Sequence, residues 1–442
     1  MKKYIGLTLL MSLLCFLVPH LSAEAKTITA GQTVSGTLGK DEKHTYQIKV
    51  TKPSRVELKG TAYSSNFELV LEDAKGETVH SLYYEFIAAS ATTPVSKKTI
   101  EYLEKGTYTV RAIHHTHLNE RTKYQFTVSV KDSRVTEGSS NNHKQLATKI
   151  APTQKTVKGQ ISWNDSVDYY KVTLKEAGRL SLDMTAYMRF LDVTMFNQNQ
   201  EKIKNIFSLY EGGEGNGVTE NMSVYLEKGT YYIEVKKYHT FTGIYTFKTK
   251  FTAAKNNEKE PNNTRSKAQV IKPNVQKVTG LLSWSDSIDY YKVNVTKNGK
   301  LHVNVQLKNT VYLTLYNRKG QRVGERMAFG NTKAVFNVKR GTYYVKIWSV
   351  EKQAPGIYKL AMSVPEMLPK SPKAKATKTK VTGTTYANSK ITAKIGSKKY
   401  TGKSNSKGAF SIKIPTQKVK TKVYVSVTTG AGTSKSTKVQ VK

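Results

Sequence analysis

The sequence predicts an all-β protein built from tandem antiparallel β-sandwich modules that end in a smaller sandwich. Short segments alternate apolar and polar residues and are separated by Gly, Asn, Asp and Lys. In one of them, Tyr343, Val345 and Ile347 would share one side of a strand and the residues between them the other side. The same landmarks return along the chain, which is typical of a repeated module. No segment carries the apolar stripe of an amphipathic helix.

Residues 1–25 have the pattern of a signal peptide. Two lysines follow Met1, residues 5–18 are largely apolar, and Ala23 and Ala25 supply the small residues that precede a cleavage site. We therefore expect a secreted protein, extracellular or associated with a cell wall. The one cysteine, Cys15, lies within this peptide, and export of a chain without thiols fits a Gram-positive bacterium. No later apolar run is long enough to span a membrane.

Two repeated motifs define the modules. Tyr-Leu-Glu-Lys-Gly-Thr-Tyr stands at 102–108 and again at 225–231, with a looser copy at 338–344. Ser-Trp-x-Asp-Ser-x-Asp-Tyr-Tyr-Lys-Val stands at 162–172 and again at 283–293. The motifs predict three homologous sandwiches, at 27–132, 135–253 and 256–365, of which the first is degenerate.

A proline-containing segment, 366–376, is expected to be a linker to a basic β-domain at 377–442. From Lys370 to the end there are 18 lysines and no acidic residue, within a chain whose net charge is +39. A balance of this kind favours polyanionic partners. Export argues against an intracellular nucleic acid and favours an anionic cell-wall polymer such as teichoic acid.

The motifs resemble the bacterial pre-peptidase C-terminal domain family, which is related to the collagen-binding domains of clostridial collagenases. The resemblance rests on an entry segment (260–263), an Asp-x-x-Asp-Tyr-Tyr strand and a late Gly-Thr-Tyr-Tyr strand. The third module has all three, whereas the entry of the second is degraded. The resemblance implies jelly-roll-like sandwiches that are non-catalytic appendages of secreted peptidases. The tail resembles a bacterial Ig-like domain at 381–385, 406–411 and 430–434.

Oxygen-bearing side chains crowd the entry of the third module and the strand motif that follows it. Carboxylates mixed with amides suit calcium, and in the collagen-binding relatives the resemblance implies that this segment is used for it. The alternative is a polar interdomain turn. The candidate calcium ligands are Glu258, Glu260, Asn262, Asn263, Asp286 and Asp289. The second module offers a reduced set, Glu137, Asn141, Asp165 and Asp168.

Outward-facing aromatic residues interleaved with lysine are candidates for ligand binding. Tyr344, Lys346 and Trp348 lie on one predicted strand of the third module. The second module has a corresponding set, Tyr232, Lys236 and Tyr238. Rings offer contact area and the ammonium groups add attraction, although tyrosine also suits the outer face of any sheet.

The sequence gives little support to catalysis. It contains no Gly-x-Ser-x-Gly elbow and no His-Glu-x-x-His motif, so we expect no enzyme and assign no catalytic residue. The predicted function is non-catalytic binding or adhesion to anionic cell-wall polymers or to extracellular matrix. The alternatives are a collagen-binding adhesin with calcium-stabilised modules and an accessory or spacer protein of a secreted peptidase.

Overall fold

The computed structural model describes residues 25–40, 42–84, 93–116, 120–138, 140–209, 212–350, 352–364, 369–429 and 432–442. Strands dominate these residues, and the two helices are single 3-10 turns, η1 (Lys144–Leu146) and η2 (Arg265–Lys267). The predicted all-β class is therefore confirmed. Neither helix of the described ranges has the length or apolarity needed to cross a bilayer. The expected signal peptide lies, apart from Ala25, outside these residues.

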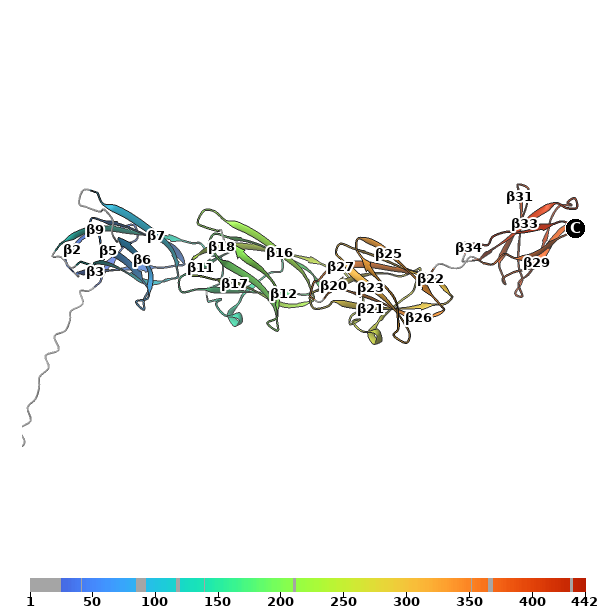
Figure 1. The fold of residues 1–442 in the computed structure, drawn as a ribbon, viewed down its shortest axis with the longest axis horizontal. Helices are drawn as coiled ribbons and strands as arrows, with labels where there is room; N and C mark the ends of the chain where they lie inside the picture. The colour runs from blue at the N-terminus through green and yellow to red at the C-terminus, as the bar shows by residue number, and fades with distance from the viewer. Residues whose placement is uncertain are drawn as a thin grey trace, which may run out of the picture. The chain divides into compact units, whose positions relative to one another are not determined.

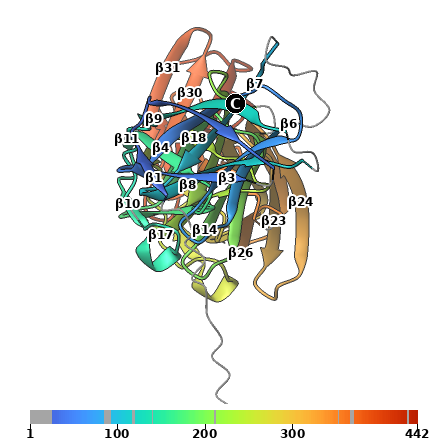
Figure 2. The same ribbon diagram turned by 90° about the vertical axis from the view of Figure 1, so that its left-hand side faces the viewer.

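In the described residues, each of the first three modules has nine strands, most of which carry labels in Figure 1 or Figure 2. The strands of the first module are β1 (Lys26–Ile28), β2 (Thr33–Leu38), β3 (Lys43–Val50), β4 (Ser54–Ala62), β5 (Phe67–Glu72), β6 (Thr78–Tyr84), β7 (Val95–Leu103), β8 (Gly106–His114) and β9 (Thr122–Asp132). The strands of the second are β10 (Thr148–Ile150), β11 (Gln154–Ile161), β12 (Val167–Leu174), β13 (Gly178–Ala186), β14 (Leu191–Asn197), β15 (Lys202–Leu209), β16 (Val218–Leu226), β17 (Gly229–Lys237) and β18 (Gly243–Ala253). The strands of the third are β19 (Gln269–Ile271), β20 (Lys277–Leu282), β21 (Ile288–Val295), β22 (Gly299–Leu307), β23 (Val311–Asn317), β24 (Arg322–Ala328), β25 (Asn331–Val338), β26 (Gly341–Trp348) and β27 (Gly356–Ser363).

The same two-sheet topology recurs in all three modules. In the first, the sheets run β1-β3-β8-β5-β6 and β2-β9-β4-β7, and the second and third repeat this order with their own strands. The opening strand pairs in parallel with its neighbour, and the other pairs are antiparallel. Without that extra strand, each module is two four-stranded antiparallel sheets in jelly-roll order, as the resemblance implied.

The core of each module lies between its two sheets because alternate residues of every strand point inward. In β26, Tyr343, Val345 and Ile347 belong to the core of the third module, and the residues between them are half-buried on the outer face. The alternation predicted for this strand is therefore confirmed.

The chain divides into two compact units, residues 1–253 and 254–442. Within the first unit, the first and second modules touch. The backbone N–H of Trp163 donates to the carbonyl of Tyr102 (3.1 Å), the Gln160 amide donates to the carbonyl of Leu103 (3.2 Å), and the Trp163 ring packs against the core of the first module. Trp163 is thus a packing residue between the first two modules.

The basic tail is a smaller two-sheet structure with its own apolar core. Its strands are β28 (Lys373–Ala376), β29 (Lys380–Thr384), β30 (Lys390–Ile395), β31 (Lys398–Lys403), β32 (Ala409–Lys413), β33 (Lys422–Thr429), β34 (Gly432–Thr433) and β35 (Thr437–Gln440). The strand β28 corrects the expected linker, 366–376, because its residues 373–376 pair with β29 and so belong to the tail. The alternation of lysine and alanine there, with Ala376 buried, is the signal of a strand.

Candidate calcium site and binding faces

The entry of the third module is fixed to two strands before the chain reaches η2. The backbone N–H of Asn257 donates to the carbonyl of Thr279 on β20 (2.9 Å), and the N–H of Tyr290 on β21 donates to the carbonyl of Asn262 (2.9 Å). The Glu260–Pro261 peptide bond between these anchors is cis. The two backbone hydrogen bonds hold the carboxylates of the entry near the start of β21.

Three carboxylates converge at this point. One oxygen from each of Glu258, Glu260 and Asp289 lies within 4.8 Å of the others. Asn262 and Asp289 are fully buried, and both amide atoms of Asn262 and the Oδ1 of Asp289 have no hydrogen-bonding partner among the described residues. Buried polar atoms without partners are rare in folded proteins, and carboxylate and amide oxygens are the ligands that calcium takes. The residues therefore fit a calcium ion.

Two buried tyrosines close the inner side of the cluster. Tyr358 on β27 donates its hydroxyl hydrogen bond to Oδ2 of Asp289 (2.6 Å), and Tyr291 on β21 donates to Oε2 of Glu258 (3.0 Å). Gly280 on β20 allows this packing, because a Cβ there would lie 2.2 Å from Cζ of Tyr358 and 2.6 Å from Oε2 of Glu258. The position of the Tyr358 ring thus explains why residue 280 is a glycine.

The carboxylates repel one another, and those of Glu258 and Asp289 are partly and fully buried, respectively, whereas Glu260 is exposed. Burial, followed by the charge of Glu258, raises the pKa of Asp289 well above its ordinary value. Burial also raises the pKa of Glu258. A cation would remove both penalties, because it favours the ionised carboxylates.

The other two predicted ligands form a pair beside the three carboxylates. The side-chain amide of Asn263 donates to Oδ1 of Asp286, which is itself buried. Asp286 lies outside the group of three, yet its charge contributes to the raised pKa of Asp289. The structure therefore brings Glu258, Glu260 and Asp289 together and leaves Asn263 and Asp286 bonded to each other.

The second module repeats the inner part of this site. Tyr245 donates to Oδ2 of Asp168 (2.6 Å), and Tyr170 donates to Oε2 of Glu137 (2.9 Å). Its sequence has Ser139 where the third module has Glu260, and Ser139 lies outside the described residues. The second module thus keeps two of the three carboxylates.

The first module keeps only the tyrosines. His44 replaces the aspartate, and its Nδ1 lies 2.7 Å from the hydroxyl of Tyr124, which in turn lies 2.5 Å from the hydroxyl of Tyr46. We call this cluster of buried tyrosines and their acidic or histidine partners the hub. The number of carboxylates in the hub rises from the first module to the third.

The predicted aromatic face of the third module is assembled on β26. Trp348 stacks on Tyr312 of β23 with ring centroids 4.7 Å apart, and Lys346 places its Nζ 4.6 Å from the centroid of Trp348. The indole N–H donates to the hydroxyl of Thr314 (3.0 Å), which fixes the ring. Tyr344 is half-buried on the same face. Sequence reasoning missed Tyr312 because the pairing of β23 with β26 cannot be read from either strand alone.

The corresponding residues of the second module are not assembled in this way. Tyr232 lies on β17 with the Nζ of Lys144 4.8 Å from its ring centroid, and Lys236 is exposed four residues further along the same strand. Tyr238 lies beyond the last residue of β17, and its 71% exposed side chain contacts His239 instead. Tyr238 is therefore in a loop and does not share the strand face predicted for it.

Comparison with known proteins gives matches to two collagenases. Collagenase ColA of Clostridium perfringens (strain 13 / Type A) is 24% identical over 281 residues, which are 60% of this chain and 25% of the relative. Collagenase ColQ1 of Bacillus cereus (strain Q1) is 27% identical over 180 residues, 40% of this chain and 18% of the relative. The chain thus spans a quarter or less of the length of the curated relatives it matches.

Among solved structures, the pre-peptidase C-terminal domain of a collagenase from Bacillus anthracis aligns with 24% of this chain and 94% of its own length, at 21% identity and a TM-score of 0.20. No family model matches the chain. The sequence matches confirm the resemblance to bacterial collagenases that the repeated motifs predicted. The Ig-like resemblance of the tail stays a prediction.

Proposed function

We propose that this chain is a secreted, non-catalytic binding protein that attaches to a collagen-like matrix protein, with calcium stabilising the entry of its third module. The observation that carries this proposal is the ordered aromatic and lysine face on β26, in a module whose entry gathers three carboxylates. The matches to two enzymes named collagenases support a collagenous ligand.

Calcium would be held by the carboxylates of Glu258, Glu260 and Asp289 and by the amide oxygen of Asn262, with Asn263 and Asp286 beside them. Bound there, the ion would supply positive charge to a cluster of three carboxylates, of which Asp289 is buried. The ligand residues themselves connect two parts of the module. Glu258 and Glu260 belong to the entry segment and Asp289 to β21, so holding them together ties the start of the module to its sheet.

The face on β26 would supply the contact with matrix protein. The stacked Trp348 and Tyr312 rings offer a flat apolar surface whose orientation is fixed in advance, which lowers the entropic cost of binding. Collagen is an extended polyproline II triple helix that exposes proline rings and backbone carbonyls. The Trp348 and Tyr312 rings would pack against the proline rings. The hydroxyl of Tyr344 and the ammonium of Lys346 would donate hydrogen bonds to the backbone carbonyls.

The collagen proposal is tested by binding of the mature chain to immobilised fibrillar collagen in the presence of calcium. The double variant Tyr344→Ala/Trp348→Ala is expected to bind at least about 10-fold more weakly, because buried aromatic anchors dominate such interfaces. The matched control Tyr424→Ala removes a 40% exposed tyrosine from the tail and is expected to bind like the wild type. Equal affinity of the double variant and the wild type would show that the face on β26 is not the collagen-binding surface. A chain with no saturable ligand at all would favour the accessory or spacer role.

The calcium proposal is tested by thermal unfolding in calcium and in EDTA. In EDTA, Asp289→Asn is expected to be at least as stable as the wild type, because it removes a buried carboxyl that resists ionisation. In calcium, the wild type is expected to gain several degrees in Tm while Asp289→Asn gains none, since an ion that binds only the folded state stabilises it. The control Asp183→Asn removes an exposed carboxylate of β13 and should keep the full calcium response. A wild type whose Tm is the same in both buffers would refute the site.

A second function, docking on an anionic cell-wall polymer such as teichoic acid, is favoured by the tail. Residues 370–442 contain 18 lysines and no acidic residue, and mixed charge would serve solubility equally well. Phosphate groups of such a polymer would be attracted over a range set by the salt concentration.

A further inference from the structure

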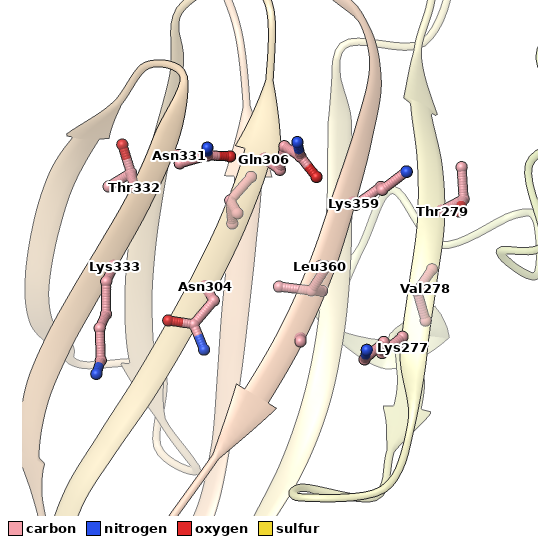
Figure 3. Close-up of a pocket in the computed structure, with 12 residues that line it drawn as sticks. Lys277, Val278, Thr279, Asn304, Gln306, Asn331, Thr332, Lys333, Lys359 and Leu360 are labelled. Atoms are coloured by element: carbon pink, nitrogen blue, oxygen red, sulfur yellow. The ribbon is translucent and has the colours of Figure 1, made fainter.

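The outer face of the four-stranded sheet in the third module is hollowed into a groove of about 590 Å³ (Figure 3). The sheet runs β20-β27-β22-β25, so segments far apart in the sequence meet there. This face is separate from the aromatic face on β26, which belongs to the other sheet. The residues that line it were not singled out by the sequence motifs.

Strand register arranges the groove in two rows of side chains. In one row, Lys359 lies opposite both Thr279 and Gln306, and Gln306 lies opposite Asn331. Figure 3 shows this row crossing the sheet above the other.

The second row has a short side chain, Ala361, at its centre. Ala361 lies opposite both Lys277 and Asn304, and Asn304 lies opposite Lys333. The methyl group of Ala361 leaves a hollow between longer side chains. Since neighbouring strands are about 4.8 Å apart, Lys277 and Lys333 stand roughly 14 Å from each other across it.

The groove is positively charged and its polar groups are available. Lys277, Lys333 and Lys359 are exposed, and none of the lining residues, all of them described, is acidic. Neither an ion pair nor a hydrogen bond engages the three ammonium groups within the described part of the chain. Further along this face, partial burial and then the charges of Lys333 and Lys300 lower the pKa of His302, which marks the same positive field.

The second module has the same sheet without the groove's chemistry. Asp183 on β13 takes the place of Asn304, five residues after the first glycine of its strand in each case. Its partner on β18 is Lys248, which stands where the third module has Ala361. The second module thus has an acidic side chain and a long lysine side chain where the third module has Asn304 and Ala361.

In the first module, the corresponding face includes Glu57, which is paired with Arg55 at 2.9 Å. Of the three modules, only the third therefore combines a central hollow with lysines and no acid in the described residues of this face.

We propose that this groove binds a linear anionic polysaccharide that carries carboxylate or sulfate groups. The three lysines would pair with the acidic groups through charge-assisted hydrogen bonds. The amides of Asn304, Gln306 and Asn331 both donate and accept, as the hydroxyls of a sugar require. This site needs neither calcium nor the aromatic face, and so it goes beyond the function proposed above.

Two other ligand classes fit the groove less well. No aromatic ring lines it, so a neutral sugar would lack a stacking surface and a single-stranded nucleic acid would lack the platform on which its bases stack. The alternation of ammonium and amide groups instead matches a chain that presents acids and hydroxyls together.

The proposal is tested on the full mature chain by lysine acylation and mass spectrometry, with a heparin-derived octasaccharide as the probe. This readout separates the groove from the lysine-rich tail, because each lysine is measured individually. The octasaccharide is expected to slow the acylation of Lys277, Lys333 and Lys359 at least about 5-fold, while Lys158 and Lys248 of the second module react at unchanged rates. A neutral maltooligosaccharide and a single-stranded oligonucleotide of similar length are the comparison ligands.

The decisive variant is Ala361→Lys, which adds a positive charge while it fills the hollow. If the octasaccharide binds in the groove, it should no longer protect Lys277 and Lys333 of this variant from acylation. If the polyanion is attracted by charge alone, protection of these lysines should be equal or stronger. Asn304→Asp, which copies the second module, is expected to lose it as well. Protection that survives in Ala361→Lys, that spreads evenly over all lysines, or that the oligonucleotide reproduces would overturn the proposal. Unchanged acylation in the wild type would overturn it too.

Discussion

At the scale of single residues, the site depends on one glycine that permits a close approach. Gly280 lies under the ring of Tyr358, and Gly159 lies under Tyr245 at the corresponding place, where a Cβ would also come within 2.2 Å of the ring. In the first module, a Cβ at Gly36 would lie 2.4 Å from the hydroxyl of Tyr124. The tyrosine can reach the buried acid, or the histidine of the first module, only because the strand beneath it carries no side chain.

The substitution Gly280→Ala is therefore expected to lower the free energy of unfolding of the third module by about 1–3 kcal/mol, as overpacking of a core does. Chemical denaturation in EDTA measures this change. Gly299→Ala is the matched control, because no atom lies within 4 Å of a Cβ built there. It should be neutral or slightly stabilising, since alanine restricts the unfolded chain. Equal effects of the two substitutions would contradict the role given to Gly280.

At the scale of elements, strand pairing turns three distant segments into one buried acidic hub. In the second module, Glu137 precedes β10, Asp168 lies on β12 and Tyr245 on β18, yet the Tyr245 hydroxyl lies 2.6 Å from Asp168 and 3.1 Å from Glu137. Burial, and after it the charge of Glu104, raises the pKa of Asp165 to about 6. Burial also raises the pKa of Glu137 and, together with the charge of Glu137, that of Asp168.

These raised pKa values predict that the metal-free protein loses stability as pH rises. The folded carboxyls bind protons more tightly than the unfolded ones, so their favourable contribution is complete below about pH 4 and is lost as pH rises through their folded pKa values. Urea midpoints measured in EDTA between pH 4 and pH 7 are expected to fall, and Asp168→Asn is expected to reduce that fall. The control Asp183→Asn, on the exposed face of the same module, should leave the pH profile unchanged. A wild-type midpoint that rises over this interval would contradict the arrangement.

Patterns within single strands could be predicted from the sequence, whereas contacts between distant strands could not. Alternation within strands such as β26 and the recurrence of motifs were sufficient for the sandwich class. Of the six candidate calcium ligands, Glu258, Glu260 and Asp289 lie close together. Tyr238 was placed wrongly because the period of two continues in the sequence past Lys237, where the strand ends. The tyrosine pair and the groove around Ala361 were missed because each needs the register of strands far apart in the chain. The repeated Asp-Tyr-Tyr motif was nevertheless a usable signal for Tyr170 and Tyr291.

At the scale of the whole molecule, the chain distributes its chemistry unevenly among its parts. The acidic cluster is most developed in the third module, while residues 370–442 contain 18 lysines and no acidic residue. Many of these lysines are exposed, including four on or near β31: Lys398, Lys399, Lys403 and Lys407. A surface of one sign attracts a polyanion without needing a shaped pocket, and such attraction is weakened by salt.

Docking on cell-wall polymers is therefore expected to depend on salt and on the tail. Sedimentation of the mature chain with isolated walls should be strong at about 50 mM salt and lost at about 500 mM, where the screening length is a few ångströms. Replacement of Lys398, Lys399, Lys403 and Lys407 by glutamine should weaken sedimentation more than the same replacement at Lys155, Lys228, Lys248 and Lys250 of the second module, which removes equal charge from exposed positions. Walls stripped of teichoic acid should no longer retain the protein. The prediction would be contradicted by sedimentation that persists in high salt or that responds equally to both sets of replacements. Either result would indicate that the faces of the sandwich modules, and not the tail, bind the wall.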